Sequence, residues 1–216
     1  MDFNDYQDNS RWDYLKQFST WHHDESIPPK KGIDGLTYIG NFADDFNDAI
    51  AECKKEAKLH DWSERHSFDF ERAGHHPIPS AYYQVKGKQT IPVFAKIVYA
   101  LGMINSRATF HLQKPGQMMA EHHDNIMGRS DNGLDPHPEE TRRFVIMLDD
   151  WHRGQVFHVG NDSLTRWKKG DCITWEWKDM PHSTANSGWS DRPMLIVTGD
   201  VTDKTIKLVE DARSKL

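Results

Sequence analysis

Short runs of apolar and aromatic residues, separated by turns, fill the chain from Thr109 to Asp200. The runs are rich in Val, Ile, Trp, Phe and Thr, which favour β-strands, and the turns carry Gly, Pro, Asn and Asp. The eight predicted strands span residues 109–113, 117–123, 143–148, 155–159, 164–168, 172–177, 182–186 and 193–200. Because eight short strands within about ninety residues are typical of a jelly roll or a barrel, the pattern predicts an all-β core.

The segment before this core is predicted to wrap it and to contribute helices. Residues 41–60 place an apolar side chain at every third or fourth position, as an amphipathic helix does. Residues 91–104 are predicted to form a second helix, with Pro92 in its first turn and Gly102 near its end. Residues 81–85 are predicted to form a strand between the two helices.

We expect a single domain over all 216 residues, because a chain of this length builds one complete core but hardly two. Its predicted parts are the wrapping segment 1–108, the core 109–201 and a C-terminal tail 202–216. Within the wrapping segment, residues 1–40 are polar and are predicted to be irregular apart from a short helix at 11–20.

Charge and cysteine content narrow the class of protein. The net charge is -6 at pH 7, which disfavours binding to nucleic acid phosphates. Cys53 and Cys172 lie far apart without metal-binding spacing, which argues against a disulfide framework and fits a reducing compartment. The N-terminal residues lack the regions of a signal peptide, and no apolar run reaches the about 18 residues of a membrane span. We therefore expect a cytoplasmic protein without membrane association.

The tripeptide His122-His123-Asp124 ends the second predicted strand. Because successive side chains of a strand alternate between faces, His122 and Asp124 point the same way. An imidazole and a carboxylate side by side are two ligands of the facial triad that holds non-haem Fe(II). With 13 histidines in the chain this spacing also arises by chance, and a second copy occurs at residues 22–24. That copy lies in a polar segment followed by two prolines, so we interpret it as a loop.

A third metal ligand must come from elsewhere, and His182, at the start of a predicted strand, is placed to supply it. Arg192 opens the next strand, which is an antiparallel neighbour in a jelly roll, so both side chains can face one cavity. A guanidinium among the apolar residues of its strand needs an anion, and a bidentate carboxylate would satisfy it. Considered alone, His182 also fits a structural histidine at a strand end whose ring nitrogens are hydrogen-bonded. Arg192 considered alone also fits a surface residue in an ion pair with Asp191 or Glu176.

Taken in order, His122-x-Asp124, His182 and Arg192 resemble the HxD...H...R signature of the Fe(II)/2-oxoglutarate-dependent dioxygenases. The stretch KPGQMMAEHHD is similar to the strand that leads into HxD, and RRFVIMLDDWHRGQVF is similar to the Arg-led strand and hairpin of prolyl-hydroxylase-like members. RWKKGDCITWEWKDMPHSTAN followed by DRPMLIV resembles aspartyl/asparaginyl hydroxylase-like members. The resemblance covers roughly residues 109–200. It implies an α+β fold with a double-stranded β-helix, a cupin-like jelly roll, flanked by the N-terminal helices.

The resemblance implies that His122, Asp124 and His182 bind Fe(II) and that Arg192 binds the C5 carboxylate of 2-oxoglutarate. Members of this family use O2 and 2-oxoglutarate to hydroxylate an unactivated C–H bond, and they release succinate and CO2. The protein's task is to orient the reactants and to exclude competing chemistry. Asp124 favours hydroxylation, because members that halogenate generally have a small residue at this position.

Further cosubstrate contacts are implied with less support from the motif. Arg143, which leads its strand, is a candidate partner of the C1 carboxylate, and Arg142 competes for that role. Asn186 and Thr198 are candidate contacts around the metal and the cosubstrate.

Two other functions fit parts of the pattern. A cupin-like metal-binding protein without 2-oxoglutarate chemistry would give Arg192 no role, and a degenerate fold used as an interaction module would be expected to have lost ligand positions. By family analogy alone, the expected substrate is a small molecule or a peptide, and more narrowly a peptidyl or free amino-acid side chain. Residues 66–83 and the loop 125–142 are suited to cover it, although the loop is equally compatible with disorder.

Overall fold

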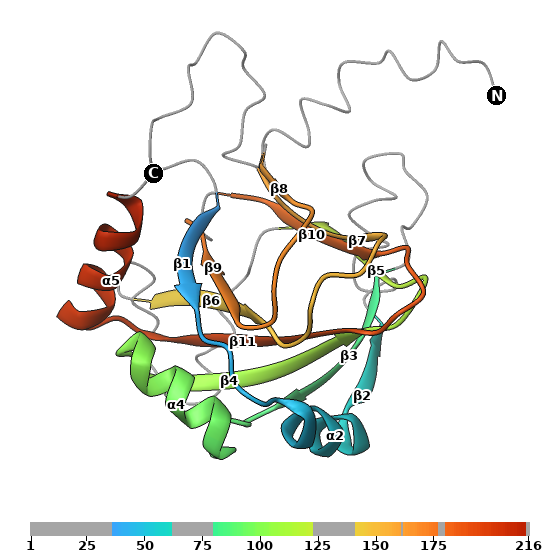
Figure 1. Ribbon diagram of the computed structural model, residues 1–216, viewed down its shortest axis with the longest axis horizontal. Helices are drawn as coiled ribbons and strands as arrows, with labels where there is room; N and C mark the ends of the chain where they lie inside the picture. The colour runs from blue at the N-terminus through green and yellow to red at the C-terminus, as the bar shows by residue number, and fades with distance from the viewer. Residues whose placement is uncertain (1–35, 62–79, 123–140, 161, 177–179, 215–216) are drawn as a thin grey trace, which may run out of the picture.

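A computed structural model gives the fold, and its described residues are 36–61, 80–122, 141–160, 162–176 and 180–214, drawn in colour in Figure 1. The predicted helix at 11–20, the second His-His-Asp copy at 22–24 and the loop 125–142, apart from its last two residues, lie outside them. So does Asp124, the predicted carboxylate ligand.

Two antiparallel sheets make up most of the described structure (Figure 1). The large sheet has seven strands in the order β1-β9-β6-β11-β4-β3-β2, and the small sheet has four in the order β5-β10-β7-β8. The strands of the large sheet are β1 (Thr37–Asn41), β2 (Lys58–Asp61), β3 (Ala81–Lys86), β4 (Ile104–Gln113), β6 (Thr141–Met147), β9 (Asp171–Thr174) and β11 (Arg192–Asp200). Those of the small sheet are β5 (Met118–His122), β7 (Gln155–Val159), β8 (Asp162–Leu164) and β10 (His182–Asn186).

From β4 onward the chain passes back and forth between the two sheets. β4, β6, β9 and β11 lie in the large sheet, while β5, β7, β8 and β10 lie in the small one. Seven of the eight predicted strands therefore exist, and β7 and β10 have the predicted ends, whereas the strand predicted at 164–168 is wrong because β8 already ends at Leu164. The other ends shift: β4 begins earlier, at Ile104, and β9 already ends at Thr174.

Side chains of the large sheet alternate between two cores. On β6, Phe144 and Ile146 face the core between sheet and helices, whereas Val145 and Met147 face the core between the two sheets. The same alternation on β11 places Met194 in the core between the sheets. A residue's position along a strand thus decides whether it faces the helices or the interior between the sheets.

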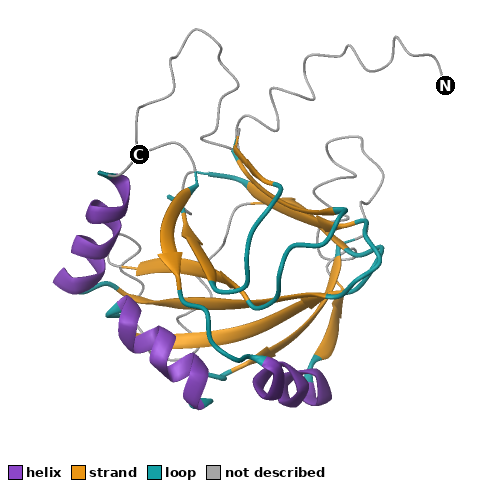
Figure 2. Cartoon of the chain, in the orientation of Figure 1, coloured by secondary structure: helices purple, strands orange, loops and turns teal. Residues whose placement is uncertain are grey.

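Three helices cover the outer face of the large sheet (Figure 2). They are α2 (Asn47–Glu56), α4 (Pro92–Leu101) and α5 (Asp203–Arg213). The helix predicted from Pro92 and Gly102 is confirmed as α4, which ends where Gly102 adopts a left-handed conformation with φ 71°. No helix in the described part of the chain is long and apolar enough to cross a membrane.

The structure adds to or differs from the sequence predictions at three places outside the core. The first predicted helix is shorter than 41–60, because Ala57 is extended and Lys58–Asp61 pairs with β3 as an edge strand. The end of the supposedly irregular segment, Thr37–Asn41, pairs with β9. The supposed tail forms α5, which starts with a capping box and buries an apolar stripe against β1 and α4.

Candidate metal and carboxylate site

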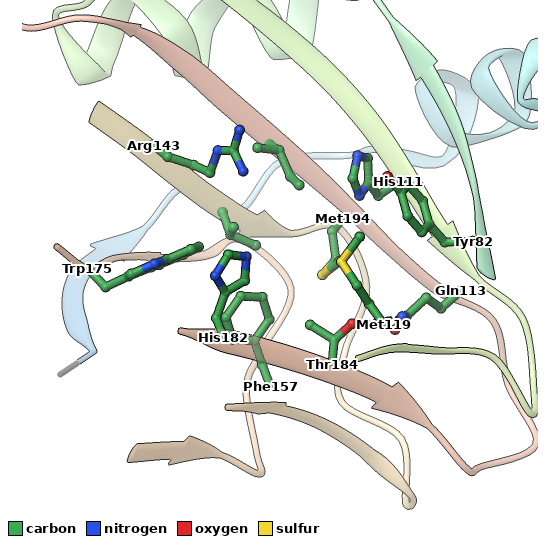
Figure 3. A pocket seen from close by; sticks show the side chains of 12 residues that line it. Tyr82, His111, Gln113, Met119, Arg143, Phe157, Trp175, His182, Thr184 and Met194 are labelled. Atoms are coloured by element: carbon green, nitrogen blue, oxygen red, sulfur yellow. Dashed lines mark hydrogen bonds between the residues drawn. The ribbon is translucent and has the colours of Figure 1, made fainter. Parts of the chain in front are cut away.

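A cavity lies between the two sheets, and side chains from both sheets line it (Figure 3). The lining residues are Tyr82, His111, Gln113, Met119, Arg143, Val145, Phe157, Trp175, His182, Thr184, Met194 and Ile196. Apolar and aromatic groups form most of the wall, and a few polar groups converge on it. Cavities of this kind are the usual binding sites for small molecules.

His122 and His182 lie opposite each other on neighbouring strands of the small sheet. Their ring centroids are 4.3 Å apart and their ring planes are inclined by 49°. His182 is buried and lines the cavity, where its ring lies 4.9 Å from that of Trp175. The fold therefore brings together two of the three predicted metal ligands, from β5 and β10.

The hydrogen bond of His122 fixes its tautomer. Its Nδ1 lies 2.8 Å from the carbonyl oxygen of Ala120. Since a carbonyl oxygen only accepts, Nδ1 carries the proton and donates it, and the lone pair of the neutral ring is on Nε2. Metal-binding histidines are typically oriented in this way. Among the described residues no group of three or more His, Cys, Asp or Glu side chains could hold a metal ion, and Asp124 lies outside that part of the chain.

Arg192 is buried at the start of β11, with 1% of its surface exposed. Its Nη1 donates to Oε1 of Gln113 at 2.5 Å, and its guanidinium lies 5.3 Å from the ring centroid of Trp167 and 5.6 Å from that of Phe157. Burial lowers the pKa of the guanidinium to about 9, so it is still a cation at pH 7. Gln113 and Phe157 line the cavity, and Arg192 lies directly behind them.

The alternative interpretation of Arg192 as a surface ion pair was wrong. Asp191 instead accepts from Lys54 at 2.7 Å. Glu176 pairs with Arg142 at 3.2 Å and also with Arg213 of α5. Among the described residues, Nε and Nη2 of Arg192 have no hydrogen-bond acceptor.

The structure distinguishes the two candidate arginines of β6. Arg143 lines the cavity, and its Nε donates to Oγ1 of Thr198 at 3.2 Å, from directly across the β6–β11 register. Arg142 faces the other way and pairs with Glu176, which also binds α5. Of the three, only Arg143 therefore lines the cavity, and Thr198 contacts it from the neighbouring strand without being a lining residue.

Asn186, predicted as a contact around the metal or the cosubstrate, is not among the residues that line the cavity. Its Nδ2 donates to the carbonyl oxygens of Gln113 at 2.9 Å and Ser190 at 2.8 Å, and its Oδ1 accepts from the backbone N–H of Gly188. These bonds order the β10–β11 loop that leads into Arg192. A short polar side chain at the end of a strand is well suited to that structural role.

Sequence reasoning missed several polar residues of the cavity, among them Gln113 and Trp175. Gln113 ends β4 and contacts Arg192, and Trp175 follows β9 beside His182. The indole N–H of Trp175 is buried, and it has no acceptor among the residues that the structure describes. A glutamine at the end of a predicted strand, on the same face as His111, was the signal available for the first. No sequence signal separates Trp175 from the other tryptophans of the chain.

No family model matches this chain, and no curated protein matches it either. Among solved structures it is similar to a prolyl-4-hydroxylase from Pseudomonas putida, at 14% identity and a TM-score of 0.45, covering 78% of this chain and 94% of that one. It is also similar to a non-heme monooxygenase in complex with nickel, at 15% identity and a TM-score of 0.48, covering 78% and 75%. A cupin 2 conserved barrel domain protein from Salinispora arenicola gives 11% identity and a TM-score of 0.33, covering 62% and 85%. Likenesses this distant assign no activity to this chain.

Proposed function

We propose that this protein is an Fe(II)- and 2-oxoglutarate-dependent oxygenase that hydroxylates an unactivated C–H bond and releases succinate and CO2. The observation that carries the proposal is that His122 lies opposite His182, which lines the cavity, while Arg192 is buried with two donors unmatched among the described residues. In the proposal, Asp124 completes the metal site from two residues beyond His122. The passage of the chain between the two sheets supports a double-stranded β-helix as the fold.

The donor set fits Fe(II). Two imidazoles from adjacent strands, of which that of His122 is held as the Nδ1–H tautomer, are ligands that suit a non-haem iron. A carboxylate from Asp124 would make the set a facial triad with open coordination positions. The aromatic rings of Phe157 and Trp175 pack against His182 and restrict its orientation.

The free edge of Arg192 fits a carboxylate. Its Nη1 is bound to Gln113, whereas Nε and Nη2, which lie along one edge of the guanidinium, have no acceptor among the described residues. Two parallel N–H groups match the two oxygens of a carboxylate. Because an unpaired buried cation is costly, a ligand that supplies this carboxylate gains a charge-assisted contact there.

In the proposed reaction, bound Fe(II) with 2-oxoglutarate and O2 supplies the oxidant that hydroxylates the substrate. His122, Asp124 and His182 hold the metal, and Arg192 anchors the C5 carboxylate of 2-oxoglutarate. Arg143, oriented by Thr198, faces the cavity from β6 and is the better placed of the two candidate arginines for the C1 carboxylate. The apolar wall excludes water from the reacting groups. As the substrate we propose a peptidyl or free amino-acid side chain.

Anaerobic addition of Fe(II) and 2-oxoglutarate tests this function. We expect a weak visible charge-transfer band, because 2-oxoglutarate then chelates a metal held by the two histidines. Oxalate in place of 2-oxoglutarate is the control and should not give the same band. If the metal binds and no band appears, the cupin-like alternative without 2-oxoglutarate chemistry is the better account.

A further inference from the structure

We infer that Gln113 determines the carboxylate specificity of the cavity by holding Arg192 with a neutral oxygen, which leaves the guanidinium charge for a distal carboxylate of the ligand. This inference rests on the proposed function and extends it to Gln113, whose side chain is hydrogen-bonded to Arg192 and Thr184. Gln113 is a positioning residue here, since it acts through Arg192.

The contacts of Gln113 define its orientation. It ends β4, is 2% exposed and lies directly opposite Arg192 in the β4–β11 register. Its Oε1 accepts from Nη1 of Arg192 at 2.5 Å, and its Nε2 donates to Oγ1 of Thr184 at 2.7 Å. Because a guanidinium only donates, the amide oxygen must face Arg192. Thr184, across the cavity on β10, holds the other end of the amide (Figure 3).

The charges around Arg192 make the neutrality of Gln113 important. Nη1 binds an amide oxygen, while Nε and Nη2 have no acceptor in the described part of the chain. The two acidic residues that the sequence suggested as ion-pair partners of Arg192 are engaged by other cations. Asp191 pairs with Lys54, and Glu176 pairs with Arg213. The rings of Phe157 and Trp167 complete the surroundings. The cation is thus held in place by a partner that does not cancel its charge.

A glutamate at position 113 has nearly the same shape and would give the opposite electrostatic result. Beside a buried guanidinium the carboxyl would ionise and pair with it, which removes the positive charge that a ligand carboxylate requires. Ligands that carry a distal carboxylate would lose affinity. Ligands that bind only through the metal would not.

The test compares 2-oxoglutarate with pyruvate, a 2-oxo acid without the distal carboxylate, in anaerobic calorimetric titrations of the full-length protein loaded with Fe(II). We expect the parent to bind 2-oxoglutarate at least about tenfold more tightly than pyruvate. Gln113→Glu should weaken 2-oxoglutarate binding by about tenfold or more, and should leave pyruvate binding within about twofold of the parent. If Gln113 had only a structural role, its substitution would change the affinities for both ligands together.

Gln113→Met is the matched variant, since it keeps the length of the side chain without adding a charge. It removes the acceptor that orients Arg192, so we expect a loss of about threefold to tenfold for 2-oxoglutarate and none for pyruvate. The inference is overturned if either variant binds 2-oxoglutarate as the parent does, or if either loses both ligands equally. A parent that binds pyruvate and 2-oxoglutarate equally well, or neither, would instead overturn the proposed function on which the inference rests.

Discussion

His182→Ala is expected to reduce the conversion of 2-oxoglutarate to succinate by at least about 100-fold, because it removes a metal ligand and not merely a neighbour of one. The imidazole of His182 lies opposite His122 and lines the cavity, whereas His111, which also lines it, stacks on Tyr82 from β4 of the large sheet. The measurement is succinate formed per protein with saturating Fe(II), O2 and 2-oxoglutarate in the absence of substrate. Thermal unfolding of the variant shows whether the fold is kept.

Two histidine variants serve as controls for this result. His158→Ala removes an exposed imidazole whose Nδ1 contacts Oγ of Ser163, and His22→Ala changes the His-His-Asp copy that was interpreted as a loop. Both should form succinate at the parent's rate. Turnover that survives in His182→Ala, or that disappears in His22→Ala, would refute the ligand assignment.

Arg192→Met is expected to weaken 2-oxoglutarate binding by about 100-fold, within the range for truncating one partner of a buried charge pair. The guanidinium is the cation behind the cavity wall, and its free edge receives the distal carboxylate in the proposed function. Without ligand, we expect the variant to unfold at a temperature no lower than the parent's, because replacing an unpaired buried charge by an apolar side chain of similar length is not destabilising. Anaerobic titration calorimetry and thermal unfolding measure the two effects.

Arg166→Ala is the matched control, because this exposed arginine only packs over the ring of Trp151. It should bind 2-oxoglutarate as the parent does. If Arg192→Met bound 2-oxoglutarate as tightly as the parent does, there would be no reason to propose a dicarboxylate ligand. A cupin-like metal-binding protein would then be the better account.

Most strands of the core were predictable because each of them carries its own local signal, whereas β8 lies before the strand predicted at 164–168. Alternating or apolar runs bounded by turns such as Lys114-Pro115-Gly116 mark them, and β7 and β10 have the predicted ends. The ends of β4 and β9 were less predictable, because they depend on which neighbouring strand is available for pairing. Most of the edge strand β2 was assigned to the preceding predicted helix, because the sequence does not show that this segment pairs with β3.

The candidate site was predictable in part, for a related reason. The resemblance named His122, His182 and Arg192, and the structure brings the two histidines together across a register that no sequence pattern specifies. Arg142 and Arg143 face opposite sides of the sheet because they are neighbours on one strand. The choice between them requires knowing which face of β6 is turned toward the other sheet. Gln113 was not found, because its role depends on Arg192 lying opposite it on β11.

The central claim is that one metal ion binds between His122 and His182 while a carboxylate binds at Arg192. Crystals grown with Mn(II) and 2-oxoglutarate, measured at a wavelength where manganese scatters anomalously, test it most directly. The account predicts a single strong anomalous peak at bonding distance from both imidazoles, with ligand density that ends at Nε and Nη2 of Arg192. A peak elsewhere, or a metal at the two histidines with no density at Arg192, would contradict it.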